Sequence, residues 1–505
     1  MPTKTTRKTA TAKSNVARPK SKSALNAKFT FSKTQLAIVI GLILVIGGII
    51  VWRVLAATSQ TEVETWSASG GNVKTVADNT ASGGSYAEFG APSTTTGLPA
   101  GVTLQAPDGG HNYRAKFTNG LPNDKNFFPI SVFSPYDLAG VYLNGKTKVQ
   151  SYAEAGINTL FSPANGACGD VGSQGNFIDI AKANGMYVFA DADKGTCGVD
   201  DAAYKTKYKG TLVGYVYQDE LEGNPCSSLA TAWLKPYCKD DGSHVSGQGF
   251  IDMSNAIRTV DTTREVGQGF TQGYALDWYI NGTQLQLAKS SDELTYDIYS
   301  LTDLRCYPAY DGCGKPWGYY THVTSARNGS GGVVPIWPDL ETSAVFSTAE
   351  NPKQYQPTPA DVKATAMNAI VAGAGGIQWF KNCFCNVAAT QDTFTDSRYA
   401  SVNTAIGQVD AQIKRLAYVI NSDFANGYFT KTGNVSATAK YDDRDGSFYI
   451  FATAHQDASQ SVSFTVKAGS SVTVVDEGRT LPLTNGLFTD IFANGTAYHI
   501  YKISR

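Results

Sequence analysis

Residues 212–224 read LVGYVYQDELEGN, and this stretch decides which fold the sequence predicts. An apolar run rich in Val and Tyr ends abruptly in Gln218, Asp219 and Glu220. A short apolar run bounded by polar residues predicts a buried strand. The two carboxylates then belong either to an ordinary polar loop or to a catalytic site. The second reading is open because barrels of parallel strands hold their reactive groups at the C-terminal ends of the strands.

Seven similar apolar segments accompany this one, separated by stretches long enough for helices. They are PISVF (129–133), GINTLFS (156–162), GMYVFADA (185–192), EVGQGF (265–270), ELTYDIY (293–299), VVPIWPDLE (333–341) and GGIQWF (375–380). Eight strands that alternate with helices predict an α/β fold, a (β/α)8 TIM barrel. An open doubly wound sheet has the same alternation, but no GxGxxG follows the first strand and a count of eight favours closure.

Beyond a further helix at roughly 401–421, the apolar pattern changes to a period of two. Segments such as SFYIFATA, SVSFTVKA and AYHIYKIS predict the strands of an antiparallel β-sandwich. The expected organisation has five parts: a disordered basic cytoplasmic tail (1–35), a membrane anchor or signal (36–57), a small β-rich region (58–125), a catalytic barrel (126–421) and a C-terminal sandwich (422–505).

The N-terminal segment predicts export. Residues 36–52, LAIVIGLILVIGGIIVW, carry no charge and are close to the shortest length that spans a membrane. Residues 1–35 contain nine Lys or Arg and no Asp or Glu, which predicts a cytoplasmic tail and places the rest of the chain outside the cell. Val54-Leu55-Ala56 is an alternative signal-peptidase site, in which case the protein is secreted.

The charge of the main body argues against nucleic acid as a partner. Nine of the 42 Lys and Arg lie in residues 1–35, so the remainder holds 33 basic and 43 acidic residues, a net charge of −10. A body of that sign repels a phosphate backbone. The membrane, through the N-terminal helix, and a carbohydrate substrate are the expected partners.

Eight cysteines, an even number in an exported chain, predict disulfides. The expected bonds join Cys168 and Cys197 in neighbouring loops, Cys226 and Cys238, and Cys306 and Cys313. Whether Cys383 and Cys385 pair with each other stays open. No CxxC pair or His-rich cluster indicates a metal site, so we expect no metal.

The C-terminal ends of the expected barrel strands carry carboxylates, aromatic rings and amides. They include Asp219, Glu220, Gln268, Asp297, Tyr299, Trp337, Asp339, Glu341 and Trp379. Aromatic rings cover the apolar faces of pyranoses, while carboxylates and amides bond the hydroxyl groups. Two carboxylates across such an opening can cleave a glycosidic bond without a cofactor.

These segments resemble the large clan of retaining glycoside hydrolases built on (β/α)8 barrels. FFPISVF and GINTLF look like the first two barrel strands of that clan, and VVPIWPDLET followed by QPTPADVKATAMNAIVAGAGGIQWF looks like its last two βα units. The resemblance implies that Glu220, at the end of strand four, is the acid/base and that Glu341, at the end of strand seven, is the nucleophile. It also implies that Trp379 is a platform beneath the sugar and that Tyr299 bonds the nucleophile.

One position departs from the clan, which has Asn before the acid/base where this chain has Asp219. A second anion beside Glu220 would raise one of the two pKa values. Among the other candidates, Gln268 is expected to bind a hydroxyl group and Trp337 to contact the sugar. Asp339 is the alternative to Glu341 as nucleophile.

The sequence therefore predicts a membrane-tethered, extracytoplasmic glycoside hydrolase that acts on a polysaccharide or glycoconjugate by double displacement. The alternative is a non-catalytic surface protein that binds carbohydrate on a glycosidase-like barrel. A structural envelope protein that uses the sandwich for adhesion is a third possibility.

Overall fold

The computed structural model of the chain separates into two units, Met1–Gly90 and Ala91–Arg505. The residues that it describes are 73–77, 85–89, 97–133, 146–161, 177–229, 231–238, 245–278, 280, 282–302, 309–345, 356–382 and 392–505. In the first unit, β1 (Val73–Ala77) and β2 (Ser85–Phe89) pair antiparallel. The barrel and the C-terminal sheets both belong to the second unit.

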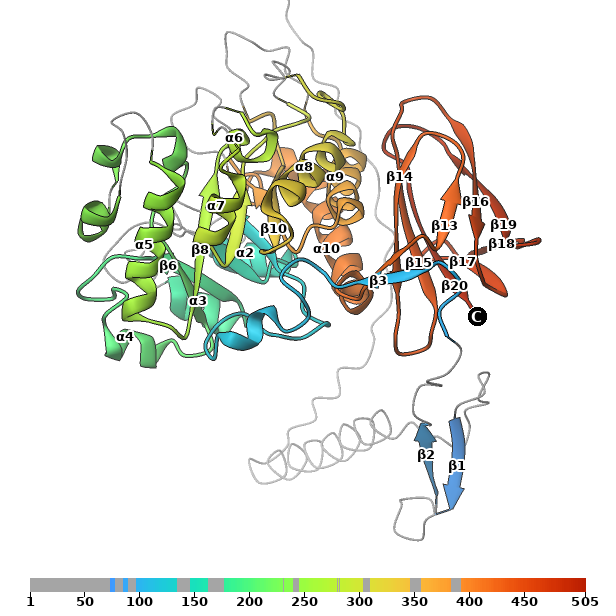
Figure 1. The fold of residues 1–505 in the computed structure, drawn as a ribbon, viewed down its shortest axis with the longest axis horizontal. Coiled ribbons are helices and arrows are strands. Elements are labelled where there is room, and N and C mark those ends of the chain that lie inside the picture. Colours follow the sequence, from blue (N-terminus) through green and yellow to red (C-terminus); the bar gives the residue numbers. More distant parts are fainter. Residues whose placement is uncertain are drawn as a thin grey trace, which may run out of the picture. The chain divides into compact units, whose positions relative to one another are not determined.

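Eight parallel strands close into a barrel, as the eight apolar segments predicted (Figure 1). The strands are β4 (Ile130–Phe133), β5 (Thr159–Phe161), β6 (Tyr187–Asp191), β7 (Leu212–Val216), β8 (Glu265–Phe270), β9 (Glu293–Tyr296), β10 (Ile336–Glu341) and β11 (Ile377–Phe380). Pairing of β11 with β4 and of β10 with both β11 and β9 completes the ring.

Helices between the strands cover the outside of the barrel. The α-helices are α2 (Lys148–Glu154), α3 (Phe177–Ala183), α4 (Ala202–Lys207), α5 (Gly247–Val260), α6 (Gln272–Leu276), α7 (Gln284–Ser290), α8 (Gly318–Ser330), α9 (Pro359–Ala372) and α10 (Ala400–Ile420). Short 3₁₀ turns are η2 (Tyr113–Lys116), η5 (Leu221–Gly223), η6 (Cys226–Ser228), η7 (Ala232–Tyr237) and η8 (Ser397–Tyr399). Apolar residues of these helices and of the outward strand faces form the largest core of the molecule.

The N-terminal half of the barrel is filled by side chains. Trp337 contacts the rings of Phe161 and Phe189 at centroid distances of 5.8 and 6.2 Å, and Leu121 packs in the same cluster. Gly267 of β8 makes room for these rings, since a Cβ there would lie 2.6 Å from Phe161. Chemistry is therefore confined to the C-terminal end of the barrel.

The segment before β4 closes the other end. From η2, the Arg114 guanidinium donates to the Glu293 carboxylate at 2.6 Å, and Glu265 lies 4.0 Å away. Both glutamates begin barrel strands and are fully buried. Burial raises the pKa of Glu293, and burial with the nearby charge of Glu293 raises the pKa of Glu265.

The C-terminal part consists of antiparallel sheets, as the period of two predicted. Its strands are β12 (Phe424–Asn426), β13 (Phe429–Lys431), β14 (Val435–Tyr441), β15 (Phe448–Ala454), β16 (Gln460–Val466), β17 (Ser471–Val474), β18 (Arg479–Leu481), β19 (Leu487–Phe492) and β20 (Tyr498–Ser504). The larger sheet has the order β18-β17-β20-β15-β14-β12-β3, and β13, β16 and β19 form the smaller one. The edge strand β3 (Thr103–Gln105) comes from the segment before the barrel.

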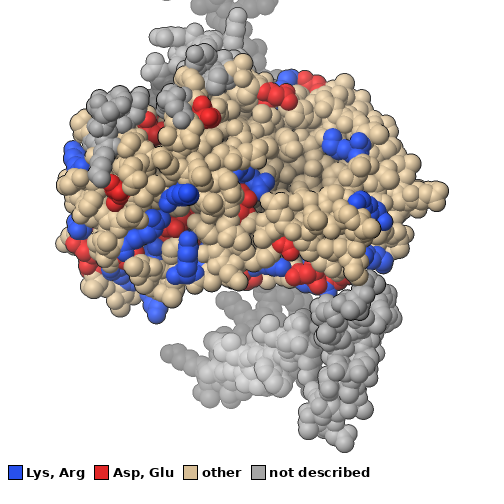
Figure 2. All heavy atoms as spheres, viewed as in Figure 1, with Lys and Arg blue, Asp and Glu red and all other residues tan. Residues whose placement is uncertain are grey.

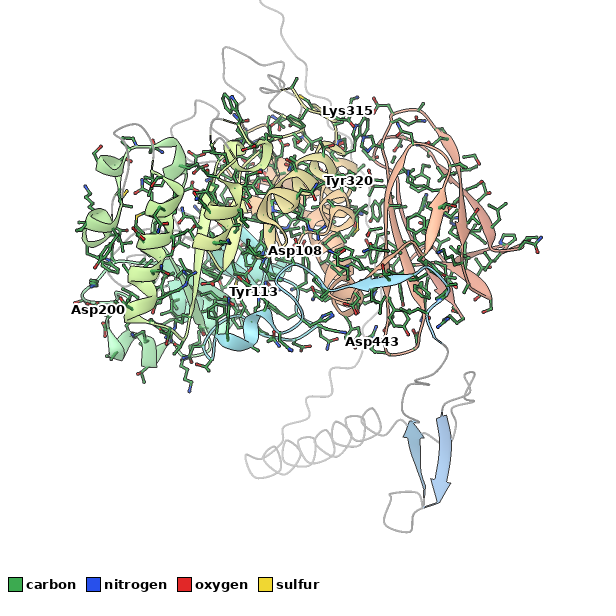
Figure 3. All side chains as sticks on the ribbon, in the orientation of Figure 1. Asp108, Tyr113, Asp200, Lys315, Tyr320 and Asp443 are labelled. Atoms are coloured by element: carbon green, nitrogen blue, oxygen red, sulfur yellow. The ribbon has the colours of Figure 1, made fainter. Side chains whose placement is uncertain are left out.

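The C-terminal sheets pack against the helices of the barrel. Thr453 of β15 donates to the Asn368 side chain of α9 at 2.8 Å. Lys315 and Tyr320, labelled in Figure 3, contact Asp457 and His455 in the loop after β15. This contact fixes β12 and β14 beside the ends of α9 and α10.

Several sequence predictions fall on parts that the structure leaves undescribed. Residues 1–35 and 36–57 lie outside the described residues, and no helix within the described part is long and apolar enough to cross a membrane. Cys197, Cys238 and Cys313 are disulfide-bonded. The side chains of their predicted partners, and those of Cys383 and Cys385, are outside the described part, so the pairings remain predictions. The face in Figure 2 has acidic and basic side chains interspersed among uncharged ones.

Candidate active site

Four carboxylates lie together at the C-terminal ends of three barrel strands. Asp219 and Glu220 follow β7, Asp297 follows β9, and Asp339 belongs to β10. The charges of Asp219 and Glu220 act on both Asp297 and Asp339, and the side chain of Asp297 hydrogen-bonds Glu220. Three strands that are separate in the sequence thus bring these groups into one electrostatic site.

This site retains protons near neutral pH. Burial, followed by the charges of Glu220 and Glu222, raises the pKa of Asp219 to about 8. Burial and neighbouring carboxylates also raise the pKa of Asp297 and of Asp339 well above the ordinary value. A hydrogen bond between Asp297 and Glu220 requires a shared proton, since two ionised carboxylates have no donor. The cluster can therefore supply a proton to a leaving group.

A glycine creates the space for Asp219. In β8, a Cβ on Gly269 would lie 2.3 Å from Asp219 Oδ1, so only glycine leaves room for this carboxylate. Gly267, two residues earlier, lies on the same inward face of the strand. The sequence EVGQGF thus provides two inward positions without side chains, of which the upper one faces the carboxylate of Asp219.

Glu220 has a left-handed backbone conformation, with φ 52° and ψ 31°. Non-glycine residues adopt this region only when surrounding contacts enforce it, and such residues concentrate at functional sites. The Glu220 amide donates to Gly269 O at 3.2 Å, and Asn224 Nδ2 donates to Glu220 O at 2.8 Å. The turn is therefore held on both sides of the candidate acid.

Two further buried side chains hold the same loop. Gln268 donates from Nε2 to the carbonyl oxygens of Gln218 and Gly269, and Glu222 accepts from the Thr271 amide. Gln268 is fully buried behind the strand, which contradicts its predicted role as a hydroxyl-binding amide. Glu222 is also buried, and burial raises its pKa to about 7. Both residues position the loop that carries Asp219 and Glu220.

An aromatic wall borders the carboxylates. Tyr299, Phe133, Phe380 and Val345 form one cluster, with Tyr299 4.9 Å and Phe133 5.5 Å from the Phe380 ring centroid. Burial raises the pKa of Tyr299, and the charges of Asp297 and Asp339 add to this effect. Tyr299 was predicted at the site. Phe133 and Phe380 were missed, because each ends a strand that is buried on both faces and whose sequence does not reveal which residues point inward.

Neither of the two predicted tryptophans lies at the mouth. Trp379 is fully buried on the outward face of β11, where Nε1 donates to Asp410 Oδ1 of α10 at 3.1 Å. Trp337 is fully buried among the rings that fill the lower barrel. These positions contradict a platform role for Trp379 and a sugar contact for Trp337.

Glu341 is engaged by the protein itself. Its carboxylate accepts from the amides of Leu301 and Thr302, the latter at 3.0 Å, and from the Tyr319 hydroxyl at 3.2 Å. The side chain is fully buried, and burial outweighs these hydrogen bonds to raise its pKa to about 8. The nucleophile role of Glu341 therefore stays a prediction. Asp339, two residues earlier, faces Asp219 and Glu220 instead.

Glu341 makes the stability of the fold depend on pH. Its pKa rises from an ordinary 4.5 to about 8 in the fold, so between these values the folded protein keeps a proton that the unfolded chain has released. We expect the free energy of unfolding of the wild type, relative to that of Glu341→Gln, to fall as the pH rises from about 6 to about 9. Urea denaturation at constant ionic strength measures this difference. A difference that stays constant or grows with pH would contradict the prediction.

The described part of the chain contains no group of three or more His, Cys, Asp or Glu residues arranged to hold a metal ion. The segments that follow several of the barrel strands lie outside the described residues. They comprise residues 134–145, 162–176, 303–308, 346–355 and 383–391.

No protein-family model and no curated protein sequence matches the chain. Solved structures with a similar fold include AbfB, a family 51 alpha-L-arabinofuranosidase from Bifidobacterium longum, at 9% identity and a TM-score of 0.43, covering 82% of this chain and 99% of its own. A glycoside hydrolase family 5 protein from Bacteroides vulgatus is 12% identical, with a TM-score of 0.48 and coverage of 75% and 90%. An alpha-amylase from Geobacillus thermoleovorans is 11% identical, with a TM-score of 0.41 and coverage of 75% and 99%.

All three neighbours are glycoside hydrolases, the class that the sequence resemblance named. At these TM-scores the similarities are too weak to bear on the substrate or mechanism of this chain. The barrel itself is established by its strand pairing.

Proposed function

We propose that this chain is an extracytoplasmic glycoside hydrolase that cleaves a polysaccharide or glycoconjugate. The observation that supports this proposal is the cluster of Asp219, Glu220, Asp297 and Asp339, proton-holding and bordered by aromatic rings, at the end of the barrel where such enzymes act. The apolar run at 36–52 and its basic flank support a membrane tether.

In the proposed reaction, Glu220 and Asp297 act as one proton-donating unit. The proton that they share passes to the glycosidic oxygen as the bond between that oxygen and the anomeric carbon breaks. Both residues are partly exposed, and Glu220 is taken as the donor to the substrate because the sequence resemblance implies that role. After the leaving group departs, the same carboxylate accepts a proton from the attacking water.

Asp339 is the proposed nucleophile. Gln378 Nε2 donates to Asp339 Oδ1 at 2.7 Å, which orients the carboxylate and partly opposes the rise in its pKa caused by burial and by Asp219. In the reactive form of the cluster, Asp339 is ionised while Glu220 and Asp297 share the proton, because four adjacent carboxylates cannot all be ionised. Asp339 forms the covalent glycosyl ester, and water then releases the sugar with retention at the anomeric carbon.

The aromatic wall is the proposed sugar platform. Phe133, Tyr299 and Phe380 form a buried cluster beside the carboxylates, and aromatic rings are the groups that cover pyranose faces. Their position beside Asp297 and Asp339 would place an anomeric carbon near both the donor and the nucleophile.

Hydrolysis by the purified chain tests the proposal. We expect new reducing ends when the chain is incubated with a panel of polysaccharides and oligosaccharides, and proton NMR at early times should show a product with the anomeric configuration of the substrate. Initial inversion would contradict double displacement. Saturable glycan binding without any product would favour the non-catalytic carbohydrate-binding alternative.

A further inference from the structure

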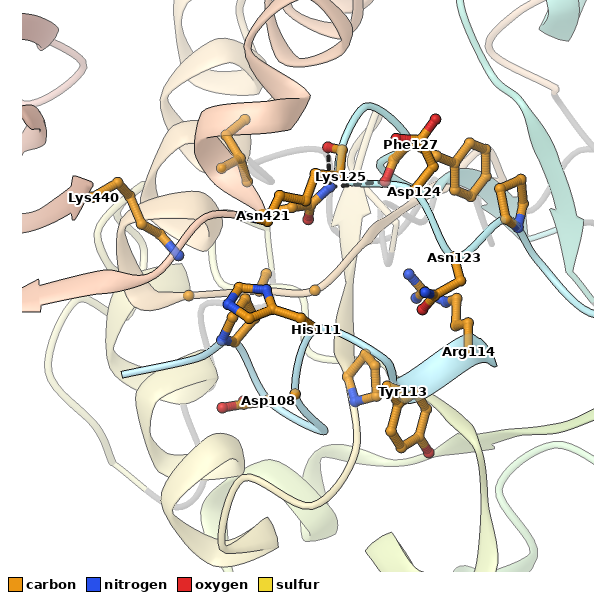
Figure 4. A pocket seen from close by; sticks show the side chains of 18 of the residues that line it. Asp108, His111, Tyr113, Arg114, Asn123, Asp124, Lys125, Phe127, Asn421 and Lys440 are labelled. Carbon is orange, nitrogen blue, oxygen red and sulfur yellow. Dashed lines mark hydrogen bonds between the residues drawn. The ribbon is translucent and has the colours of Figure 1, made fainter. Parts of the chain in front are cut away.

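A pocket lies at the opposite end of the barrel from the carboxylates. Its cavity volume is about 70 Å³, and it is open to solvent. Pro335 and Gly375, which precede β10 and β11, form part of its wall together with the segment before β4. The C-terminal ends of α9 and α10 and the strands β12 and β14 complete it (Figure 4). A cavity of this size has room for several water molecules or for one small oxyanion.

Lys440 of β14 is the unusual member of this wall. Only 2% of the residue is exposed, yet its ammonium group lies at the pocket. Nζ donates to Ser422 O at 3.0 Å and lies 3.3 Å from the centroid of the Phe424 ring. Among the described residues no carboxylate lies within ion-pair distance of Nζ. Burial lowers the pKa of Lys440 well below its ordinary value.

The acids nearest to Lys440 are already bonded to other side chains. Asp108 accepts two hydrogen bonds from Arg327, at 2.6 and 2.7 Å. Asp423 is bonded to His111 at 2.6 Å. A buried ammonium without a carboxylate partner costs free energy, and an anion in the pocket would remove that cost.

Other donors border the same space. Figure 4 shows Lys440 and His111 on one side of the pocket and Arg114 with Asn123 on the other. Arg114 Nη2 is buried and has no hydrogen-bond partner in the described part of the chain. Asn421, which also lines the pocket, donates to the carbonyl oxygens of Lys125 and Phe127 and so fixes the segment that contains these two residues.

We propose that this pocket binds a small oxyanion, either a carboxylate or a phosphate group, with Lys440 as its charged partner. Both groups accept several charge-assisted hydrogen bonds from an ammonium and from neighbouring N–H donors. The apolar side chains of Ile370, Ile420 and Phe424 would contact the remainder of the ligand. The site is independent of the proposed hydrolase chemistry because it lies at the N-terminal ends of the strands.

Calorimetric titration of the full chain in detergent tests the proposal, with inorganic phosphate and D-glucuronate as separate probes. We expect saturable binding of at least one probe, and its identity distinguishes a phosphate source from a carboxylate source. Lys440→Met should weaken that binding by about tenfold or more, because it removes a charge-assisted contact while keeping the length of the side chain. Lys502→Met is the matched control. Lys502 lies on β20 of the same sheet and pairs with Asp445, so this variant should bind as the wild type does.

A second measurement does not depend on the variant. Burial and the charge of Arg327 disfavour the charged form of Lys440 and outweigh Asp108 and Asp423, which favour it and of which Asp423 is bonded to His111. Anion binding should therefore be accompanied by proton uptake. Titrations in two buffers of different ionisation enthalpy detect this uptake at a pH above that at which Lys440 loses its proton. Absence of saturable binding for both probes, equal affinity of Lys440→Met and wild type, or binding without proton uptake would overturn the proposal.

Discussion

Glu220→Gln is expected to slow the hydrolysis of substrates with poor leaving groups by about 10²- to 10⁴-fold, while activated aryl glycosides keep much of their turnover. The amide cannot protonate the glycosidic oxygen, but a leaving group of low pKa does not need that proton. Steady-state kinetics on a natural oligosaccharide and on a nitrophenyl glycoside of the same sugar measures the two effects.

Glu222→Gln is the matched control for this experiment. It removes a carboxylate from the same loop, yet its amide oxygen can still accept the hydrogen bond from the Thr271 amide. We expect both substrates to retain most of their turnover. An equal loss on the two substrate types in Glu220→Gln, or an equal effect of Glu222→Gln, would exclude Glu220 as the acid.

Asp339→Asn and Glu341→Gln are expected to separate the two candidates for nucleophile. Asn at 339 still accepts from Gln378 but cannot attack the anomeric carbon, so kcat/KM should fall at least about 10³-fold on both types of substrate. Mass spectrometry of the wild type with a slow fluorinated glycoside should locate the covalent sugar on Asp339.

Glu341→Gln should act on stability instead. The amide nitrogen would face a backbone donor, because Leu301, Thr302 and Tyr319 all donate to the carboxylate. Loss of one such hydrogen bond lowers the free energy of unfolding by about 1–3 kcal/mol. kcat/KM should stay within a few-fold of the wild type. The reverse pattern, with loss of activity in Glu341→Gln and none in Asp339→Asn, would restore the assignment made from the clan resemblance.

The barrel could be predicted from the sequence because each strand is a short apolar run of the kind that is buried on both faces. Such runs do not alternate, however, and so they do not reveal which residues point inward. At the end of β11, Trp379 and Phe380 are both apolar and buried, and a shift of one residue exchanges the face that each occupies. The sequence therefore located the strand but suggested Trp379, and not Phe380, as the ring beside the carboxylates.

The carboxylate site was predictable only in part for a similar reason. Asp219 and Glu220 directly follow a strand, and their clustering at its end was visible in the sequence. The sequence did not show which carboxylate of β10 joins them, since Asp339 and Glu341 are two residues apart and so point to the same face of the strand. The two residues differ in their contacts, because backbone amides of the loop after β9 donate hydrogen bonds to Glu341. A contact between residues some forty positions apart has no local signature.

The pairing of β3 with β12 affects how the chain is assembled. Gln105 and Asn426 are 321 positions apart in the sequence, yet their side chains bond at 2.9 Å. During synthesis, β3 leaves the ribosome before any barrel strand and has no partner until the whole barrel has been made. The edge of this sheet is thus among the last structures to form. A protease that cuts between β3 and η2 in the newly made chain would separate β3 from the barrel and leave the β12 edge of the sheet without its covalently attached partner strand.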